Sequence, residues 1–485
     1  MNLLLLLLII IILFLFVNFF KYKVSFCLSL FLVLIFYYIV FSPLIKPYYE
    51  TIEPDDGNLV DLNYITQALR NYRLYICDIK DTPTINAQNR QEKQYLDTRD
   101  LSIYKNKIYL YFGITPVILF HLPFNLITNL YLSMIFVNIL LIFFIFLLSV
   151  LLFEKMMSFL EINIKTYDIK IIRVLSIFLL AIGPQLFHIM RGVYLEEILT
   201  ALFLILMAFY ILLLYFTEKN ISLKKYFLFF MSVVLALSVG ARPQNIFLIP
   251  FFLIILIHDE YCLSKNIKKI IETGLIFLIP CILYGSLLGL YNYLRFDSIF
   301  EFGYIYMPVH NQKLYTDIKE IFNGIIYSFF TFPQINLQTI FQLNYHIHPR
   351  VNCGITGIIY LQPMVLFLLL VPFFICLNRN IKYIYLCVLW LIDFLSNSII
   401  TNFSAISSRY IIEYSIIMQI FALAIFIKLY EQIKTKTVKC LVIISFIIIL
   451  VYSIFINIAI MFNVYNVDIP ISIDKINNLI DFLFK

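Results

Sequence analysis

The sequence predicts an all-α polytopic membrane protein with about twelve transmembrane helices. Hydrophobic residues make up 62% of the chain and charged residues only 13%, and the mean hydropathy is +0.92. Apolar runs recur along the chain at close to the roughly 20 residues that a helix needs to cross a bilayer core. No stretch outside these runs is long enough to form an independent soluble domain.

Twelve apolar runs are predicted to span the membrane. They lie at residues 2–20, 24–43, 131–153, 172–189, 197–217, 224–240, 244–258, 270–291, 355–376, 382–401, 410–430 and 437–461. The first run lacks the basic n-region and small-residue cleavage site of a signal peptide, so we expect a retained span. The resulting segments are two N-terminal spans over 1–45, a first outer loop over 46–130, a central transmembrane module over 131–291, an outer loop over 292–354 and a C-terminal transmembrane module over 355–485.

Lysine and arginine gather in six short connectors, and these predict the orientation of the chain. The connectors cover residues 21–23, 154–170, 218–225, 258–269, 378–382 and 430–439. Short cytoplasmic loops are enriched in these residues, and all six fall on one side only if residues 112–128 do not cross the bilayer. Pro116, His121 and Pro123 suit a juxtamembrane helix along the interface better than a straight span. Both termini and the first loop are therefore predicted to face outward.

The first outer loop begins with the acidic stretch TIEPDDGNLVDLNY (51–64). Asp61 precedes a plausible amphipathic helix, where a carboxylate favours the helix start. For any one of these acids, a solvated loop residue is the ordinary interpretation. The adjacent Asp55 and Asp56 at the membrane surface are nevertheless candidates for a general base or a metal ligand.

A second acidic pair, Glu196 and Glu197, lies at the mouth of an apolar span, shortly after Arg191. One glutamate in a first helical turn is explained by the helix dipole. Two carboxylates at the edge of the hydrocarbon are harder to explain in that way, because ionisable groups at membrane depth usually face a cavity. A structural and a functional role are equally favoured for this pair.

Three arginines lie in or near outward-facing connectors: Arg242 in SVGARPQN, Arg295 in YNYLRFDSIFEFGY and Arg409 in SSRY. The default interpretation is an arginine whose charged end reaches the interface. The alternative is recognition of a lipid phosphate, whose oxygens match the planar guanidinium fork. Arg242 is the sharpest of the three because it stands in a tight turn between two apolar runs.

Other motifs carry weaker signals. His346 and His348 form an HxH without a third ligand nearby, which favours a surface loop over a metal site. Cys77 and Cys353 both fall in outer loops and would be able to pair in an oxidising compartment. The net charge of +7 does not indicate a nucleic-acid partner, because the lysines sit in short loops between spans.

From about residue 46 to 430, this layout resembles the GT-C class of integral membrane glycosyltransferases, which includes protein O-mannosyltransferases and lipid A aminoarabinose transferases. Within the class it is more similar to uncharacterised bacterial members. The strings that carry the resemblance are EPDDGNLVDLNYITQALRNYRLYI, DLSIYKNKIYLYFG, RGVYLEE, SVGARPQN, YNYLRFDSIFEFGY and the late SRY. The chain departs from the class pattern in an extra early span and in PDDG where an Asp-Glu pair is more familiar. This leaves open which of Asp55, Asp56 and Asp61 holds the acidic position of the class.

The resemblance implies a GT-C-like fold with a large first outer loop, and transfer of a sugar from a polyprenyl-phosphate-linked donor to an acceptor hydroxyl, with inversion. The acceptor would be a glycan, lipid or protein at the outer face of the cell (inner) membrane. The absence of a nucleotide-binding loop fits a donor that arrives in the lipid. The implied catalytic acids are Asp55, Asp56, Asp61, Glu196 and Glu197, and the implied phosphate-binding residues are Arg191, Arg242 and Arg409. A divalent metal, Mg²⁺ or Mn²⁺, would be held by Asp56 and Glu196.

Two other activities compete with this one. An O-antigen polymerase or ligase would depend on arginines of a late outer loop, such as Arg295 and Arg350. A transporter or flippase of lipid-linked sugars would need charged or broken-helix sites near mid-membrane, and the predicted spans are nearly free of charge. Asp393 in WLIDFLSN is the visible exception.

Overall fold

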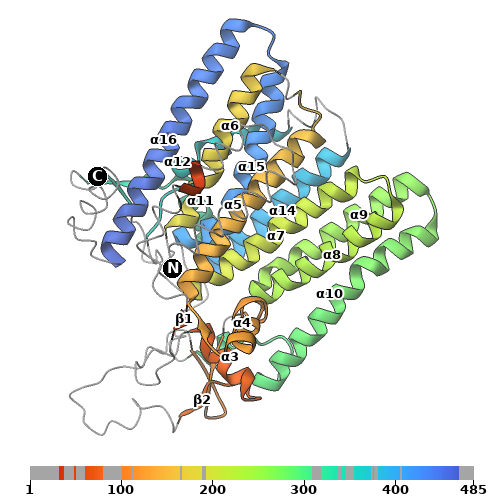
Figure 1. Ribbon diagram of the computed structural model, residues 1–485, viewed down its shortest axis with the longest axis vertical. Coiled ribbons are helices and arrows are strands. Elements are labelled where there is room, and N and C mark those ends of the chain that lie inside the picture. The colour runs from red at the N-terminus through yellow and green to blue at the C-terminus, as the bar shows by residue number, and fades with distance from the viewer. Residues whose placement is uncertain are drawn as a thin grey trace.

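The computed structural model is a bundle of long apolar helices with a small polar cap at one end (Figure 1). The structure describes residues 32–35, 37, 49–50, 61–79, 101–111, 113–163, 166–187, 193–307, 318–336, 340–344, 354–372, 375, 381–404 and 407–468. Eight stretches of helix in these ranges are long and apolar enough to cross a membrane. They comprise α5 (Met134–Phe159), α6 (Tyr167–Ala181), α7 (Val193–Thr217), α8 (Ile221–Ala241), α9 (Leu248–Ser264), α10 (Ile267–Phe296), α15 (Ser408–Gln432) and α16 (Lys436–Asp468), with short 3₁₀ segments continuing α6 and preceding α9. The chain is therefore a multi-pass membrane protein.

The other four predicted spans are not among these eight. The run 2–20 and most of 24–43 lie outside the described residues. The run 382–401 forms α14 (Ile381–Ser404). Its apolar part, Tyr383–Ile399, is shorter than the eight candidate spans. The run 355–376 is not one helix, because it breaks at Gln362–Pro363 into α12 (Ile358–Leu361) and the 3₁₀ helix η8 (Pro363–Leu370). Proline lacks the N–H that would continue an α-helix.

The central helix of the bundle is α15. In its most apolar stretch 94% of the residues are buried, against 22% for α10, which faces outward. It packs against α5, α6, α7, α14 and η8, and Figure 1 shows it within the bundle. A helix that is hydrophobic on all sides belongs in such a core. The polar residues that α15 carries are therefore held inside the protein.

Two helix breaks near the core leave backbone carbonyls without their helical donors, and neighbouring side chains satisfy them. After α6, the Gly183–Pro184 break begins η4 (Pro184–Leu186), and the Ala181 carbonyl accepts from the Tyr37 hydroxyl at 2.5 Å. At the second break, the Leu361 carbonyl accepts from Ser453 Oγ and Asn457 Nδ2 of α16, both at 2.7 Å. An unsatisfied carbonyl in hydrocarbon would cost several kcal/mol, so these contacts stabilise both breaks.

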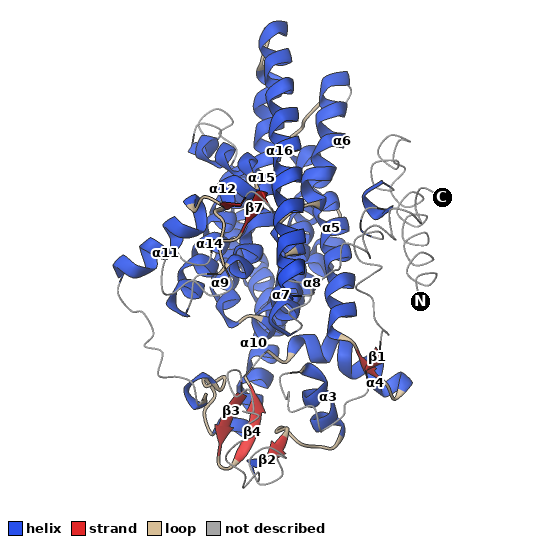
Figure 2. Ribbon diagram, turned by 90° about the vertical axis from the view of Figure 1, so that its left-hand side faces the viewer, coloured by secondary structure: helices blue, strands red, loops and turns tan. Residues whose placement is uncertain are grey.

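The cap contains α3 (Leu62–Arg70) and an antiparallel sheet in the order β2–β4–β3. The strands are β2 (Cys77–Asp78), β3 (Leu101–Tyr104) and β4 (Lys107–Leu110), at the lower end of Figure 2. Hydrogen bonds fasten the β3–β4 hairpin to the chain after α10: Ser102 Oγ donates to the Gly303 carbonyl at 2.7 Å, and Lys105 and Tyr104 bind Asp297. The Lys105 and Tyr104 contacts hold the pKa of Asp297 below its usual range. The cap is thus fixed to the end of α10.

Residues 117–128 form the juxtamembrane helix of the cap, as a π-helical turn, η3 (Val117–His121), continued by α4 (Leu122–Thr128). Twelve residues reach about 18 Å, well short of the roughly 30 Å of a bilayer core. The polar His121 and Asn125 are buried, whereas Leu126 and Ile127 are 63% and 82% exposed. This inverted pattern suits a helix that turns its apolar side to lipid and its polar side to the protein.

The described connectors separate by charge between the two ends of the bundle. Because consecutive spans run antiparallel, the turns after α6, α8 and α10 lie at the cap end (Figure 1). The turns after α5, α7, α9 and α15 lie at the other end, where the basic connectors 154–170, 218–225, 258–269 and 430–439 also fall.

Two short two-stranded sheets, β1 (Tyr49–Glu50) with β5 (Tyr131–Leu132) and β6 (Gln334–Asn336) with β7 (Ile340–Gln342), complete the described strands.

Candidate functional site

A buried chain of polar side chains joins the cap to the start of α7. His121 Nε2 lies 2.7 Å from Glu196 Oε1, and both side chains are fully buried. On its other side, His121 Nδ1 lies 2.9 Å from Asn63 Oδ1. Asn63 Nδ2 in turn donates to the Leu132 carbonyl at 2.9 Å. These contacts lock together α3, the juxtamembrane helix and α7.

The orientation of Asn63 fixes the position of one proton in this chain. Since Asn63 Nδ2 donates to Leu132, its Oδ1 must accept from His121 Nδ1–H. The other nitrogen of His121 then shares a single proton with Glu196, either as imidazolium and carboxylate or as imidazole and carboxylic acid. Glu196 Oε2 has no hydrogen-bond partner among the described residues. Glu196 therefore holds the cap through Oε1 alone.

Asp61 is the N-cap of α3, the position in which the sequence places a helix start. Its carboxylate accepts from the Asn63 backbone N–H at 2.6 Å. An N-cap of this kind stabilises a helix by about 1 kcal/mol. Because α3 carries Asn63, the cap also orients the contact between Asn63 and His121.

Glu197 lies on a different face of α7 from Glu196. It is next to a point where the backbone at Gly113 comes very close to the backbone at the end of α8. Its carboxylate accepts from the Gly113 N–H. A Cβ on Gly113 would stand 2.3 Å from the Gly240 carbonyl oxygen and 2.7 Å from that of Ala241, so no other residue fits there. The glycines of YFG and SVGAR therefore bring the C-terminal end of α8 against the acid.

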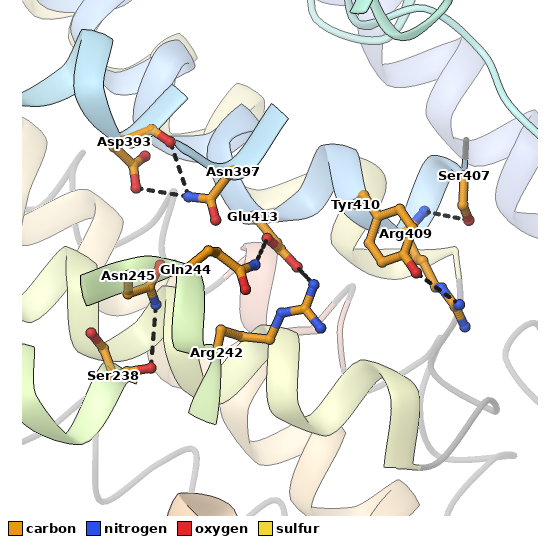
Figure 3. Close-up of polar contacts among 10 residues, drawn as sticks. All are labelled: Ser238, Arg242, Gln244, Asn245, Asp393, Asn397, Ser407, Arg409, Tyr410 and Glu413. Carbon is orange, nitrogen blue, oxygen red and sulfur yellow. Dashed lines mark hydrogen bonds and ion pairs between the residues drawn. The ribbon is translucent and has the colours of Figure 1, made fainter. Parts of the chain in front are cut away.

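Arg242 follows α8 directly and points toward α15 (Figure 3). Its Nη2 lies 2.5 Å from Glu413 Oε1, and Gln244 Nε2 donates to Glu413 Oε2 at 2.8 Å. Burial lowers the pKa of the Arg242 guanidinium, but the negative charge of Glu413 and of further neighbours, Glu197 among them, more than offsets burial and leaves that pKa raised. Arg242 stays charged and 20% exposed, and its Nε has no hydrogen-bond partner among the described residues.

Tyr410 lies between Arg242 and the second arginine, Arg409. The guanidinium carbons lie 5.7 Å (Arg242) and 5.0 Å (Arg409) from the centre of the Tyr410 ring, and Arg409 Nη2 donates to the Tyr410 hydroxyl at 3.1 Å. Figure 3 shows both arginines beside this ring. Each contact is of the cation–π type. The half-buried Tyr410 ring thus holds two guanidiniums close together at the cap end.

A further acid, Asp393 of α14, lies beside Asn397 near this cluster (Figure 3). It is 1% exposed, and Asn397 Nδ2 donates to its Oδ1 at 3.0 Å. Asp393 interacts electrostatically with Glu413. The charge that the sequence singled out inside a span therefore belongs to the same polar region.

The structure places five of the implied site residues at the cap end: Asp61, Glu196, Glu197, Arg242 and Arg409. Asp55, Asp56 and Arg191 lie outside the described residues, as do His346, His348, Arg350 and the Cys353 partner expected for Cys77. Within the described ranges, no three or more His, Cys, Asp or Glu residues form a group able to hold a metal. The pairing of Asp56 with Glu196 at a metal thus stays a prediction.

Sequence reasoning missed four residues of this site: Asn63, Gln244, Tyr410 and Glu413. His121 was noted only as unsuited to a straight span. Glu413 had a signal available, a lone acid one helical turn after Arg409 in an apolar run, since buried acids are retained where a cation pairs with them.

No family model matches the chain, and no curated protein matches it. Among solved structures, two crystal structures of the Archaeoglobus fulgidus oligosaccharyltransferase match. The apo form has a TM-score of 0.49 at 11% identity and covers 89% of this chain and 55% of its own. The form tethered to an acceptor peptide containing the NVT sequon has a TM-score of 0.48 at 12% identity, over 88% and 54%. The chain spans about half the length of that protein.

Replacing His121 by Leu is expected to lower the free energy of unfolding by about 3–5 kcal/mol, because Glu196 would remain buried without its partner. The double variant His121→Leu/Glu196→Leu should recover most of that loss. Thermal unfolding in detergent measures both. Equal stability of wild type and His121→Leu would contradict the proposed coupling of cap and bundle.

Proposed function

We propose that the chain is a membrane glycosyltransferase of the GT-C type. It would move a sugar from a polyprenyl-phosphate-linked donor to an acceptor hydroxyl on the extracytoplasmic side of the membrane. The observation that carries the proposal is the convergence, at one end of the bundle, of buried acids from α7 and α15 with two arginines around Tyr410. Ionisable groups at membrane depth usually mark a substrate or ion pathway, and the pairs Arg242–Glu413 and His121–Glu196 hold these charges in place at one end of the bundle.

The arginine side of the cluster suits a lipid phosphate. Arg242 and Arg409 lie at the cap-side ends of spans, and Arg242 stays charged and partly exposed. A guanidinium binds phosphate oxygens through two parallel hydrogen bonds. During transfer the bond between the sugar and the phosphate breaks, and the growing negative charge on the phosphate is stabilised by these arginines.

The acidic side supplies the proton acceptor. The acceptor hydroxyl attacks the anomeric carbon, its proton passes to a carboxylate, and polyprenyl phosphate leaves with the bonding electrons. A single displacement of this kind inverts the anomeric centre. Asp55 or Asp56 of the first loop is our candidate base, and Glu197 is the acid of α7 that lies within range of Arg242.

We place a metal ligand at Glu197 because this acid lies within range of Arg242. Glu196 contacts His121 through Oε1 and has no partner at Oε2 among the described residues, whereas the Glu197 carboxylate accepts from a backbone N–H and lies in the field of Arg242. Carboxylate oxygens are the ligands that Mg²⁺ and Mn²⁺ prefer. A divalent ion held by Glu197 and Asp56 would stabilise charge on the leaving phosphate.

The broken helices are the feature that favours a transporter or flippase. In transporters, unwound segments present carbonyls to a bound ion or substrate. Here the carbonyls of Ala181 and Leu361 already accept from Tyr37, Ser453 and Asn457. The breaks are thus explained by packing, and the transferase remains the better-supported activity.

The test is a reconstituted assay with a panel of polyprenyl-phosphate sugars. Protein in proteoliposomes should release polyprenyl phosphate, measured by thin-layer chromatography, and transfer the labelled sugar to an added membrane extract. Movement of the labelled lipid between leaflets without any release of polyprenyl phosphate would contradict the proposal and support a flippase.

A further inference from the structure

An apolar groove lies at the end of the bundle opposite to the cap, between η8, α15 and α16. Its volume is about 450 Å³, within the roughly 300–1,000 Å³ typical of ligand pockets. Its lining includes Met364 and Phe367 of η8, Phe426 and Leu429 of α15, and Phe446 and Ile449 of α16. Although only three residues join α15 to α16, the two helices leave this space beside the stacked rings of Phe426 and Phe446, whose centres are 5.1 Å apart.

The groove runs from the connector end of the membrane toward its middle. Its lining on α16 runs from Val442 to Ile449, and the facing lining residues run from Phe426 to Ile433. Seven positions at about 1.5 Å per residue give roughly 10 Å, less than the roughly 15 Å of one leaflet's hydrocarbon. The groove therefore holds part of one acyl chain, whose remainder continues into the surrounding hydrocarbon.

Water is a poor occupant of this space. A buried water needs two to four polar partners. The polar lining residues are Tyr430 and Gln432 near the connector and Ser445 further in. The deeper part of the groove thus favours a hydrocarbon chain.

The mouth of the groove is cationic. Lys434 and Lys436 are exposed, and the Lys439 ammonium lies 5.4 Å from the centre of the Tyr430 ring. The nearby acids have other contacts, because Glu431 pairs with Lys428 at 3.2 Å and Asp168 accepts from the Tyr430 hydroxyl at 3.2 Å. Lysines at the level of the headgroups attract anionic lipids.

We propose that this groove binds one anionic phospholipid, with an acyl chain along Phe446 and its phosphate among Lys434, Lys436 and Lys439. The site is separate from the cap cluster and does not depend on sugar transfer. It would anchor α16, whose most apolar stretch is only 28% buried, to the core helix α15.

Titration with phosphatidylglycerol and phosphatidylcholine, read by native mass spectrometry of the detergent-purified full chain, tests the proposal. Wild type should retain one phosphatidylglycerol in preference to phosphatidylcholine. The triple variant Lys434→Gln/Lys436→Gln/Lys439→Gln should lose that affinity by about tenfold or more. Val442→Trp and Ser445→Phe, which place bulk in the groove, should both prevent retention of the lipid.

The matched control is Lys265→Gln/Lys268→Gln/Lys269→Gln, three exposed lysines at the same end of the bundle and away from the groove. It should bind phosphatidylglycerol as wild type does. Equal losses in both triple variants would overturn the site in favour of general surface attraction. Preference for phosphatidylcholine or for polyprenyl phosphate, retention by both bulky variants, or a dimer in place of bound lipid would also overturn it.

Discussion

Replacing Arg242 by Gln is expected to lower the rate of sugar transfer by about 10²–10³-fold, the usual cost of losing a group that stabilises developing charge. Arg242 is the guanidinium that joins Glu413 at 2.5 Å and lies beside Tyr410, at the end of the bundle where we place the lipid phosphate. The reconstituted release of polyprenyl phosphate is the measurement. Arg242→Lys should recover only part of the rate, because an ammonium cannot bind two phosphate oxygens as a fork does.

Loss of stability is separated from loss of chemistry by a matched variant. Arg173 also pairs with an acid, Glu154, through contacts of 2.5 and 2.6 Å, at the end opposite to the cap. Arg173→Gln should lower the melting temperature as Arg242→Gln does and leave transfer largely unchanged for the protein that remains folded. Equal losses of transfer in the two variants would mean that Arg242 acts through folding alone.

Glu197→Gln is expected to reduce transfer by about 10²–10⁴-fold, the range found when a carboxylate needed in the chemistry is neutralised. Glutamine keeps the shape and can still accept from Gly113, so the fold should persist. The neighbouring Glu196→Gln is the comparison, since an amide can still hydrogen-bond to His121. The two variants should therefore differ strongly in rate and little in melting temperature.

A larger loss of transfer in Glu196→Gln than in Glu197→Gln would reverse the roles that we assign to the two acids. If Glu196→Gln removed transfer and Glu197→Gln retained it, the chain of Asn63, His121 and Glu196 would be part of the chemistry. If both variants kept full activity, neither acid of α7 would take part in transfer, and the acidic function would rest on the first loop.

The sequence predicts the helical framework well because hydrophobic length is a strong and local signal. The runs that become α5, α7 and α15 were located from composition alone, and the non-spanning helix at 117–128 followed from Pro116, Pro123 and the charges of distant connectors. The run 355–376 was wrongly taken as one helix, although Pro363 lies inside it. Apolar content does not reveal this break, because the carbonyl that it leaves without a helical donor is satisfied by distant side chains. The Leu361 carbonyl accepts from residues almost a hundred positions away.

The site was predictable only in part, since its contacts join distant segments. Arg242 and the pair Glu196 and Glu197 stood out as charges at the ends of apolar runs. The separate contacts of Glu196 and Glu197 could not be inferred from their being neighbours in the sequence, because neighbouring positions on a helix face directions about 100° apart. Glu413 stood as a lone acid one turn after Arg409, but its pairing with Arg242, which lies 171 positions earlier in the chain, could not be inferred locally.

The most direct measurement is the position of a bound lipid phosphate in an experimental structure of the full chain with polyprenyl phosphate. Our account predicts the phosphate at the cap end, with oxygens at about 3 Å from nitrogens of Arg242 or Arg409 and the prenyl chain descending along the bundle. A phosphate bound only at the opposite end, among the basic connectors, would contradict it.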